Sequence, residues 1–287
     1  AYAFASLVFR PERPRERPLK REDAPELFKL VDKAREIAGA PAIHRVMLTS
    51  DFDLGVINMA RFGVWDLPPF LGGTRNYLLV GMPLAQSLSV NQFSALLVHL
   101  MMRLKLMQTT PVGQAVLQRN LWWRGFQTLR RKRSPTVWPL RLFAASHAPA
   151  LYTLSIPLVQ ELTANADASA AKVIGNALMA DAFIGHAVAA RYYRDSYLPQ
   201  LDAEAELAPT PRGSVFGRIA PAMAALWASA QANRTLTTCL AERSSVTDTV
   251  PALSERLEAL QVQPRMPPPP RMPAATVIFG EHLGAHL

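Results

Sequence analysis

Acidic residues are absent from a long internal stretch of this 287-residue chain, because no aspartate or glutamate occurs between Asp66 and Glu161. The same stretch carries ten cations: Arg75, Arg103, Lys105, Arg119, Arg124, Arg130, Arg131, Lys132, Arg133 and Arg141. A water-activating zinc site needs a carboxylate base, and this stretch offers none. The excess of cations, +9 over the whole chain, favours an anionic partner: nucleic acid, acidic lipid headgroups or an acidic protein.

Cysteine and long apolar runs are also scarce. The single cysteine, Cys239, excludes an internal disulfide and any cysteine-rich metal site, and we expect it to be a small core residue. No run of eighteen apolar residues occurs, so no segment is predicted to cross a membrane by itself. Hydrophobic residues make up 49% of the chain, which is enough for a sizeable core.

Prolines concentrate at the two ends of the chain. Residues 1–20 are predicted to form an extended, basic, Pro-rich arm, and residues 263–287 a Pro-rich linker with a C-terminal tail. The apolar start, Ala1 to Phe9, has two readings: the remnant of a targeting or membrane segment, or a strand or arm that packs on a neighbour.

Local patterns predict a short β-containing part followed by helices. Before residue 108 we expect helices over 23–38, 84–88 and 89–107 and strands over 45–49, 55–60 and 75–80. After it we expect helices over 112–133, 148–175, 177–197, 214–240 and 251–260, with a loop at 200–213, and the tail leaves room for one more short helix. Pro199 is expected to stop the helix before it. The predicted class is α+β, mainly α, with one domain over residues 21–262.

The stretch from Ser89 to Met107 is the most informative one. Ser89 and Gln92 have the spacing of a capping box, which predicts a helix start. Apolar residues then recur at helical spacing, so one face is expected to be buried. His99 and Arg103 lie four residues apart and therefore share a face.

Three stretches, taken in order, resemble the HtpX-like and CAAX-prenyl-protease-like family of membrane-associated zinc peptidases. Residues 75–99 resemble its edge strand and the approach to the H-E-x-x-H motif, residues 161–171 its E-x-x-A-D segment, and residues 250–257 its H-P-x-x-x-x-R-[LI] segment. The resemblance covers about residues 18–262 and implies a zincin fold with a small N-terminal β-sheet and a helical C-terminal part.

The departures from the family pattern remove its chemistry. His99 matches the first zinc ligand, whereas Leu100 stands at the catalytic glutamate, Arg103 at the second histidine, Thr163 at the glutamate ligand and Val250 at a later histidine. Asp167, which in the family supports the site, is kept. Arginine has no lone pair for a metal and repels one. We therefore expect no catalytic residue, no bound metal and no cofactor, which makes the chain a predicted pseudopeptidase.

Arg103 and Asp167 suggest a structural replacement for the metal. In the family the two site helices face each other, so Arg103 is expected to point at the helix that carries Asp167. A buried charge without a partner is costly, and we therefore predict an Arg103–Asp167 ion pair in the former zinc site. The other histidines lack metal spacing and are interpreted as structural: His44, His147, His186, His282 and His286.

Three functions remain open from the sequence. The first is a structural or accessory subunit, or an adaptor, of a larger membrane-bound complex, which contacts other subunits through the arm and the Pro-rich tail and lies in an organelle (mitochondrion or plastid) or a bacterial envelope. The second is binding of anionic lipid, or less favourably nucleic acid, by residues 103–141 through Trp122, Trp123, Arg124, Arg130, Arg131, Lys132 and Arg133. The basic run is equally compatible with a solvated helix end. The third, an active zinc peptidase, is disfavoured by the missing ligands.

Overall fold

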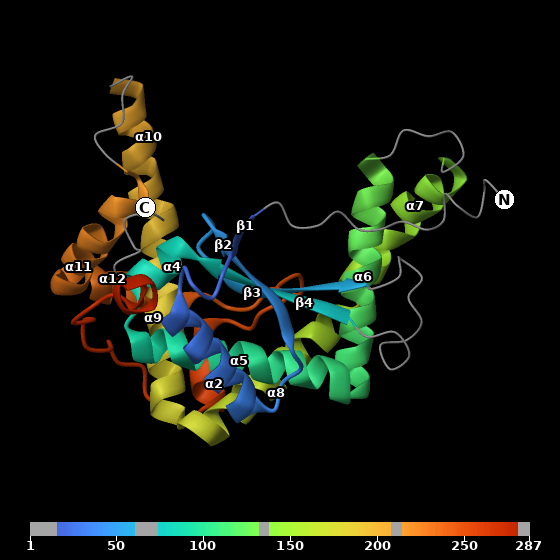
Figure 1. The fold of residues 1–287 in the computed structure, drawn as a ribbon, viewed down its shortest axis with the longest axis horizontal. Helices are drawn as coiled ribbons and strands as arrows, with labels where there is room; N and C mark the ends of the chain where they lie inside the picture. The colour runs from blue at the N-terminus through green and yellow to red at the C-terminus, as the bar shows by residue number, and fades with distance from the viewer. Residues whose placement is uncertain (1–15, 61–73, 132–137, 208–213, 281–287) are drawn as a thin grey trace.

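A four-stranded sheet lies against a larger helical body, which confirms the predicted mainly helical α+β class (Figure 1). The computed structural model describes residues 16–60, 74–131, 138–207 and 214–280. Its first half contains β1 (Arg17–Leu19), α2 (Pro25–Ala38), β2 (Ile43–Thr49), β3 (Leu54–Ala60), β4 (Thr74–Gly81), α4 (Met82–Ser87), α5 (Val90–Thr109) and α6 (Pro111–Arg131). Its second half contains α7 (Trp138–Leu154), α8 (Ile156–Ile174), α9 (Asn176–Tyr192), the π turn η2 (Tyr193–Tyr197), α10 (Leu198–Leu207), the 3-10 turn η3 (Phe216–Arg218), α11 (Ile219–Ala228), α12 (Ala230–Ala241), α13 (Leu253–Ala259) and α14 (Ala274–Phe279).

The sheet has the strand order β1-β2-β4-β3, with β2 and β4 parallel and the two outer pairs antiparallel. Strands β2 and β3, which flank the predicted turn at residues 51–53, are therefore separated by β4. The close approach of this turn to β4 depends on Gly81, because a Cβ there would lie 2.2 Å from the carbonyl oxygen of Asp51. Residues 17–19, expected in an extended arm, instead form the edge strand β1 on β2 and bury Leu19.

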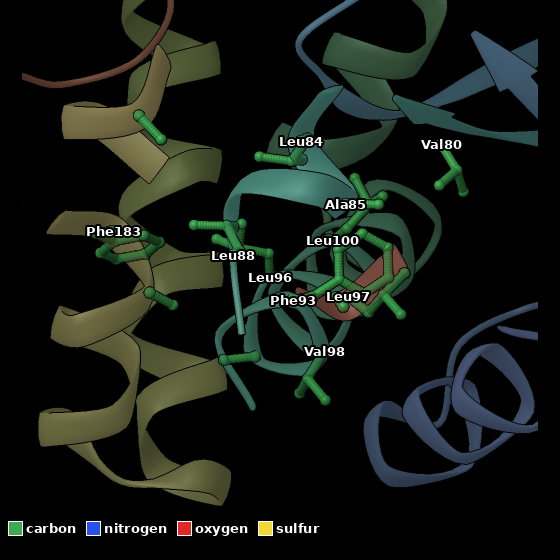
Figure 2. Close-up of a cluster of buried hydrophobic side chains, with 14 of the residues drawn as sticks. Val80, Leu84, Ala85, Leu88, Phe93, Leu96, Leu97, Val98, Leu100 and Phe183 are labelled. Atoms are coloured by element: carbon green, nitrogen blue, oxygen red, sulfur yellow. The ribbon is translucent and has the colours of Figure 1, made fainter. Parts of the chain in front are cut away.

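Helices α2 and α5 cover one face of the sheet. Val46 of β2 and Leu78 and Val80 of β4 belong to the same core cluster as the buried side chains of both helices. Figure 2 shows Leu84, Leu88 and Leu96 gathered between strand β4, which carries Val80, and helix α9, which carries Phe183. Alternate residues of the strands point to the other face, where Met47, Met59 and Tyr77 form a smaller cluster.

Helix α5 is the central element, since it packs against α2, α6, α8 and α9. Its predicted capping box is confirmed: the Gln92 backbone N–H donates to Ser89 Oγ at 3.3 Å, and the Ser89 backbone N–H donates to Gln92 Oε1 at 3.0 Å. The Gln92 amide also donates to the carbonyl of Asp181 on α9 at 3.3 Å. The cap therefore fixes both the start of α5 and its position beside α9.

Prolines explain where two helix predictions were wrong. The helix predicted over 148–175 is two helices that meet at Ser155, because Pro157 lies in the first turn of α8 and has no N–H to donate to the last turn of α7. Helix α7 also begins earlier, at Trp138, and keeps Pro149 in its interior. Pro199 does not stop a helix. It lies in the first turn of α10, where its missing N–H is not needed, so part of the loop predicted at 200–213 is helical.

The predicted C-terminal tail is partly core. Helix α14 buries Ala274, Ala275, Ile278 and Phe279 in the main cluster and packs against α2, α4 and α5. The Ala274 N–H donates to the carbonyl of Leu88 at 2.8 Å, directly before the α5 cap. The buried residues of α14 recur at helical spacing, so one face of this short helix can pack against the core. The folded unit therefore extends beyond residue 262 to α14.

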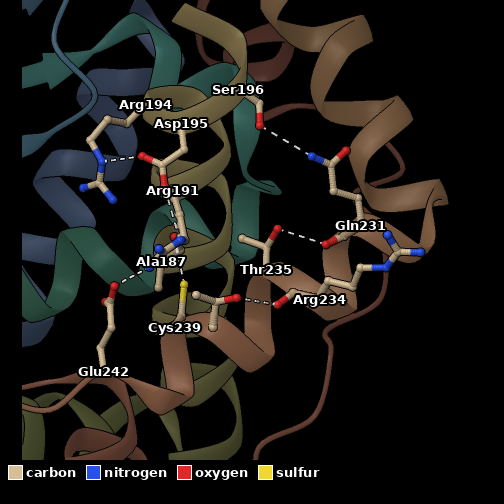
Figure 3. A network of polar contacts seen from close by, with 11 residues as sticks. Ala187, Arg191, Arg194, Asp195, Ser196, Gln231, Arg234, Thr235, Cys239 and Glu242 are labelled. Atoms are coloured by element: carbon tan, nitrogen blue, oxygen red, sulfur yellow. Dashed lines mark hydrogen bonds and ion pairs between the residues drawn. The ribbon is translucent and has the colours of Figure 1, made fainter. Parts of the chain in front are cut away.

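Cys239 is buried where α12 packs on α9, as expected for a small core residue. Its Sγ lies 3.8 Å from the carbonyl oxygen of Ala187, and burial raises the pKa of its thiol (Figure 3). Beside it, Arg191 pairs with Glu242 and, at 3.3 Å, with Asp195. This polar network ties α12 to the end of α9.

Candidate functional site

One cavity of about 160 Å³ collects the positions that the resemblance assigns to zinc chemistry. Helix α5 contributes His99, Leu100 and Arg103, helix α8 contributes Thr163, and the segment before α13 contributes Val250. The first three share one face of α5 because of their spacing, and α8 packs directly against α5. The structure thus brings together five positions from three stretches that are far apart in the chain.

Asp167 anchors the inner wall beside this cavity. It is buried, and it receives two hydrogen bonds of 2.7 Å each from Arg256, from Nε to Oδ2 and from Nη2 to Oδ1. His99 Nε2 lies 2.7 Å from Asp167 Oδ1. Burial alone would raise the pKa of Asp167, but the contacts with His99 and Arg256 hold it below its ordinary value. The carboxylate therefore stays ionised and holds a histidine and an arginine from different helices.

His99 is neutral in this setting. Burial lowers the pKa of its imidazole and outweighs the opposing effect of Asp167. The ring meets Phe183 edge-on, with centroids 5.6 Å apart. The neutral ring therefore carries its proton on Nε2 and directs it at Asp167 Oδ1, although the N–H is not aligned for a regular hydrogen bond.

Arg256 is the residue that sequence reasoning missed. Its guanidinium lies over the Phe183 ring, 3.4 Å from the centroid, and forms the two-pronged contact with Asp167. Arg256 follows Val250 in the third stretch of the resemblance, which was the available signal, but nothing in that pattern named Asp167 as its partner.

The predicted Arg103–Asp167 ion pair was wrong, because Arg256 and His99 occupy both oxygens of Asp167. Arg103 does lie at the cavity, but its Nε is buried without a hydrogen-bond partner, and within the described residues it forms no ion pair. Burial, followed by the charge of Arg256, lowers the pKa of Arg103, while the carboxylates of Asp167 and Asp53 oppose this. Arg103 is thus a half-buried cation whose Nε is shielded from solvent and which lacks a bonded counter-charge among the described residues.

The side chains at the cavity do not fit a catalytic zinc ion, which requires about three histidine, cysteine or carboxylate ligands. Across the described ranges no group of three or more such residues is placed to hold a metal. His99 is engaged with Asp167, and the guanidinium groups of Arg103 and Arg256 would repel a divalent cation.

A second cavity of about 440 Å³ adjoins the first, since Phe183, His186, Val250 and Arg256 line both. His186 had been interpreted only as a structural histidine. Burial, followed by the charge of Arg256, lowers the pKa of His186 to about 4, so its ring is uncharged at neutral pH. Arginines also line the wider cavity: Arg191, Arg194 and Arg243.

The residues predicted to bind an anionic surface do not form one exposed face. Trp122, Arg130 and Arg131 of α6 are exposed, whereas Trp123 and Arg124 are partly buried. Trp123 packs on Tyr152 of α7 with ring centroids 4.8 Å apart, and burial lowers the pKa of Arg124. Lys132 and Arg133 lie outside the described residues.

Helix α7 instead exposes apolar side chains, which sequence reasoning did not anticipate. The most exposed are Trp138 at 60%, Leu142 at 59%, Phe143 at 54% and Leu154 at 78%. Only small residues, Ala144 and Ala148, are fully buried along the described side chains of this helix. We call α6 and α7 the hairpin; they lie side by side at the end of the molecule opposite α10–α12 (Figure 1).

An apolar groove of about 300 Å³ runs between the two helices of the hairpin. Its walls include Trp122, Trp123, Phe126, Leu151 and Tyr152. Taken one at a time, the described helices are too short or too polar to cross a bilayer. Residues Arg141–Leu154 and Ile156–Ile174 reach the necessary length and composition only as a pair, bent by 41°.

Comparison with known proteins gave no match: no family model, curated protein or solved structure is significantly similar to this chain. The resemblance to zinc peptidases therefore rests on the three sequence stretches and on nothing outside them.

Proposed function

We propose that the protein is a catalytically inactive relative of the HtpX-like and CAAX-prenyl-protease-like peptidases, with a zincin-like fold. The supporting observation is the cavity at which His99, Leu100, Arg103, Thr163 and Val250 meet. The resemblance aligned these five positions before the structure placed them, and Thr163 and Val250 are far in the chain from the three positions on α5. Where the family has two zinc ligands and a base, this wall has an arginine and apolar or hydroxyl side chains, which cannot activate water.

The proposed role is that of a structural or accessory subunit, or an adaptor, in a larger membrane-bound complex of an organelle or a bacterial envelope. The core of the fold is intact, but the residues needed for hydrolysis are missing. Such a domain is suited to binding other subunits. The extended stretch at residues 262–270 lies mostly on the surface, but α14 ties its end to the core, so it would offer a fixed ridge to a partner. The arm at residues 1–15 would supply a second contact.

The test is purification of the tagged full chain from its native membranes in mild detergent, followed by native mass measurement. We expect a complex well above the monomer mass, with the same partners at a fixed ratio in repeated preparations. A chain that lacks residues 1–15 keeps strand β1, and we expect it to retain the melting temperature but to lose partners. Recovery of a free monomer alone would contradict the proposal.

Metal analysis separates this role from an active peptidase. The purified chain, equilibrated with one equivalent of zinc and passed over a desalting column, is expected to retain only traces of the metal. Stoichiometric zinc that disappears in the His99→Ala variant would overturn the proposal, and zinc-dependent peptide cleavage by the same preparation would do so too.

We propose as a second function that the hairpin binds an anionic lipid surface. The favouring observation is the exposed apolar face of α7, since exposed leucine, phenylalanine and tryptophan side chains suit a bilayer interface better than a nucleic acid backbone. Exposed cations of α6, Arg130 among them, lie at the end of the same hairpin and suit acidic headgroups.

Vesicle flotation tests this function with phosphatidylglycerol-containing and purely phosphatidylcholine vesicles. We expect binding to the anionic vesicles and at least about tenfold weaker binding after the double change Leu142→Ser and Leu154→Ser. The control double change, Leu207→Ser and Val246→Ser, removes two even more exposed apolar side chains elsewhere and should bind as the parent does. RNA binding that survives the α7 change, together with absent vesicle binding, would favour nucleic acid instead.

A further inference from the structure

Arg103 lacks the partner that a buried cation normally has. Its Nε is shielded from solvent and makes no hydrogen bond, and no carboxylate in the described part of the chain lies within ion-pair distance. Removing a guanidinium from water without a counter-charge costs several kcal/mol, which is why such groups are usually paired. A bound anion would supply the pairing group that the described residues do not provide.

The wall around Arg103 presents further hydrogen-bond donors. Arg256 uses Nε and Nη2 to bind Asp167, and its Nη1 has no hydrogen bond within the described chain. His186 lines the same cavity with an uncharged ring, whose N–H can donate. Two guanidinium groups and an imidazole thus border one small space.

The carboxylates near the cavity leave this space open to an anion. Asp167 is fully engaged by Arg256 and His99 on the inner wall. Asp53 lines the cavity on an exposed turn, where its Oδ1 accepts the backbone N–H of Leu54 at 2.7 Å. Asp53 acts on Arg103 only through space, so the guanidinium keeps a free binding edge.

We propose that this cavity binds an oxyanion, a carboxylate or phosphate group, with Arg103 as its principal contact. The planar guanidinium fork matches the paired oxygens of either group, which a spherical ion such as chloride does not offer. The volume of about 160 Å³ suits a group of this size, and the adjoining cavity of about 440 Å³ can take the organic remainder of a larger ligand. This inference does not depend on descent from a peptidase, because it rests on the donors alone.

Calorimetric titration and thermal shift of the full chain with sodium acetate, sodium phosphate and sodium chloride test the proposal. We expect saturable binding and a raised melting temperature with acetate or phosphate, and no saturable effect of chloride at matched ionic strength. The acetate and phosphate arms show which oxyanion is preferred. Chloride that matches both oxyanions would overturn the proposal, since a screening effect would then explain the shift.

Two variants locate the binding site. Arg103→Met is expected to weaken oxyanion binding by at least about tenfold, because it removes the charged donors. Lys105→Met is the matched control, since it removes one positive charge from the same helix at a residue that does not line the cavity, and it should bind as the parent does. Equal affinity in the Arg103→Met variant and the parent would overturn the proposal.

A third variant keeps the test decisive if Arg103→Met fails to fold. Arg103→Lys retains the positive charge but loses the planar guanidinium group. We expect this variant to bind oxyanions more weakly than the parent does and with no preference over chloride. Unchanged oxyanion selectivity in the folded Arg103→Lys variant would show that the anion binds elsewhere.

Discussion

The cavity between α5 and α8 and the hairpin of α6 and α7 depart from ordinary packing in opposite ways. The cavity is bordered by charged and titratable groups, with the buried Asp167 behind its inner wall, whereas the hairpin exposes large apolar side chains such as Leu154. Soluble proteins usually do the reverse. The difference teaches that the cavity depends on pairing among its own buried groups, whereas the exposed side chains of α7 make few contacts with the fold and are accessible for binding, although α6 stays tied to the core through Val116, Leu117 and Leu121.

The largest effect is expected from Asp167→Asn, which would break the polar side of this comparison. The change leaves Arg256 buried without its counter-charge, and breaking such a pair costs about 3–5 kcal/mol. Urea unfolding at pH 7 measures the loss. Asp195→Asn, which alters a more exposed ion pair, is the control and should cost no more than about 1 kcal/mol. Equal small losses in both variants would show that the buried cluster is not a stability centre.

The second largest effect is expected from acid, which should lower the free energy of unfolding through the histidines at the cavity. The pKa of His186 is about 4 in the folded chain and 6.5 when unperturbed, so the unfolded state binds more protons between these values. Stability therefore falls as the pH falls through this window, by about 3 kcal/mol for this one group. The depressed pKa of His99 acts in the same direction, whereas Asp167 contributes only at more acidic pH, near and below its ordinary value.

Urea unfolding at pH 7 and at pH 4.5 checks this slope. His186→Asn is expected to flatten it. A slope that is the same in parent and His186→Asn would mean that His186 is protonated in the folded state.

Arg103→Met, unlike the changes above, is expected to increase the free energy of unfolding. In buffer without oxyanions, replacement of this half-buried, unpaired cation by an apolar side chain of similar length is expected to raise stability by about 1 kcal/mol. The exposed control Arg234→Met should stay within about 0.5 kcal/mol. A loss of stability in Arg103→Met would mean that Asp53 and Asp167 compensate the cation through space.

The smallest effect is expected at the hairpin. Leu142→Ser combined with Leu154→Ser should change the free energy of unfolding by less than about 1 kcal/mol in total, since both side chains are already in contact with solvent. Leu97→Ala in α5 is the buried comparison and should cost about 2–5 kcal/mol. A large loss from the α7 changes would show that the hairpin is part of the stable core.

The features that could be predicted from sequence were those with local causes. The α5 cap depends on two residues three positions apart, and the strands and the α5 stripe follow from short periodic patterns. The grouping of His99, Thr163 and Val250 came from family resemblance, since no local pattern joins them. The pairing of Arg256 with Asp167 is a long-range contact that neither approach could provide.

Helix α7 shows the limit of hydrophobic patterns most clearly. Its composition predicts an apolar helix. The sequence pattern of a helix that is apolar on most sides is the same whether the helix is covered by other parts of the protein or by another apolar environment. The break at Ser155 was, in contrast, readable from Pro157. Burial of α7 depends on which helices pack against it, and this information lies in distant parts of the chain.

The bond from Ala274 to Leu88 has a consequence for the order of folding. The start of α5 is completed by a segment that the ribosome makes long after α5 itself. Until α14 arrives, the apolar side chains of Leu88 and Phe93 lack part of their cover, and the nascent chain carries an unfinished core. Contacts between such distant segments also slow folding, so this chain would depend on chaperones or an early partner during synthesis.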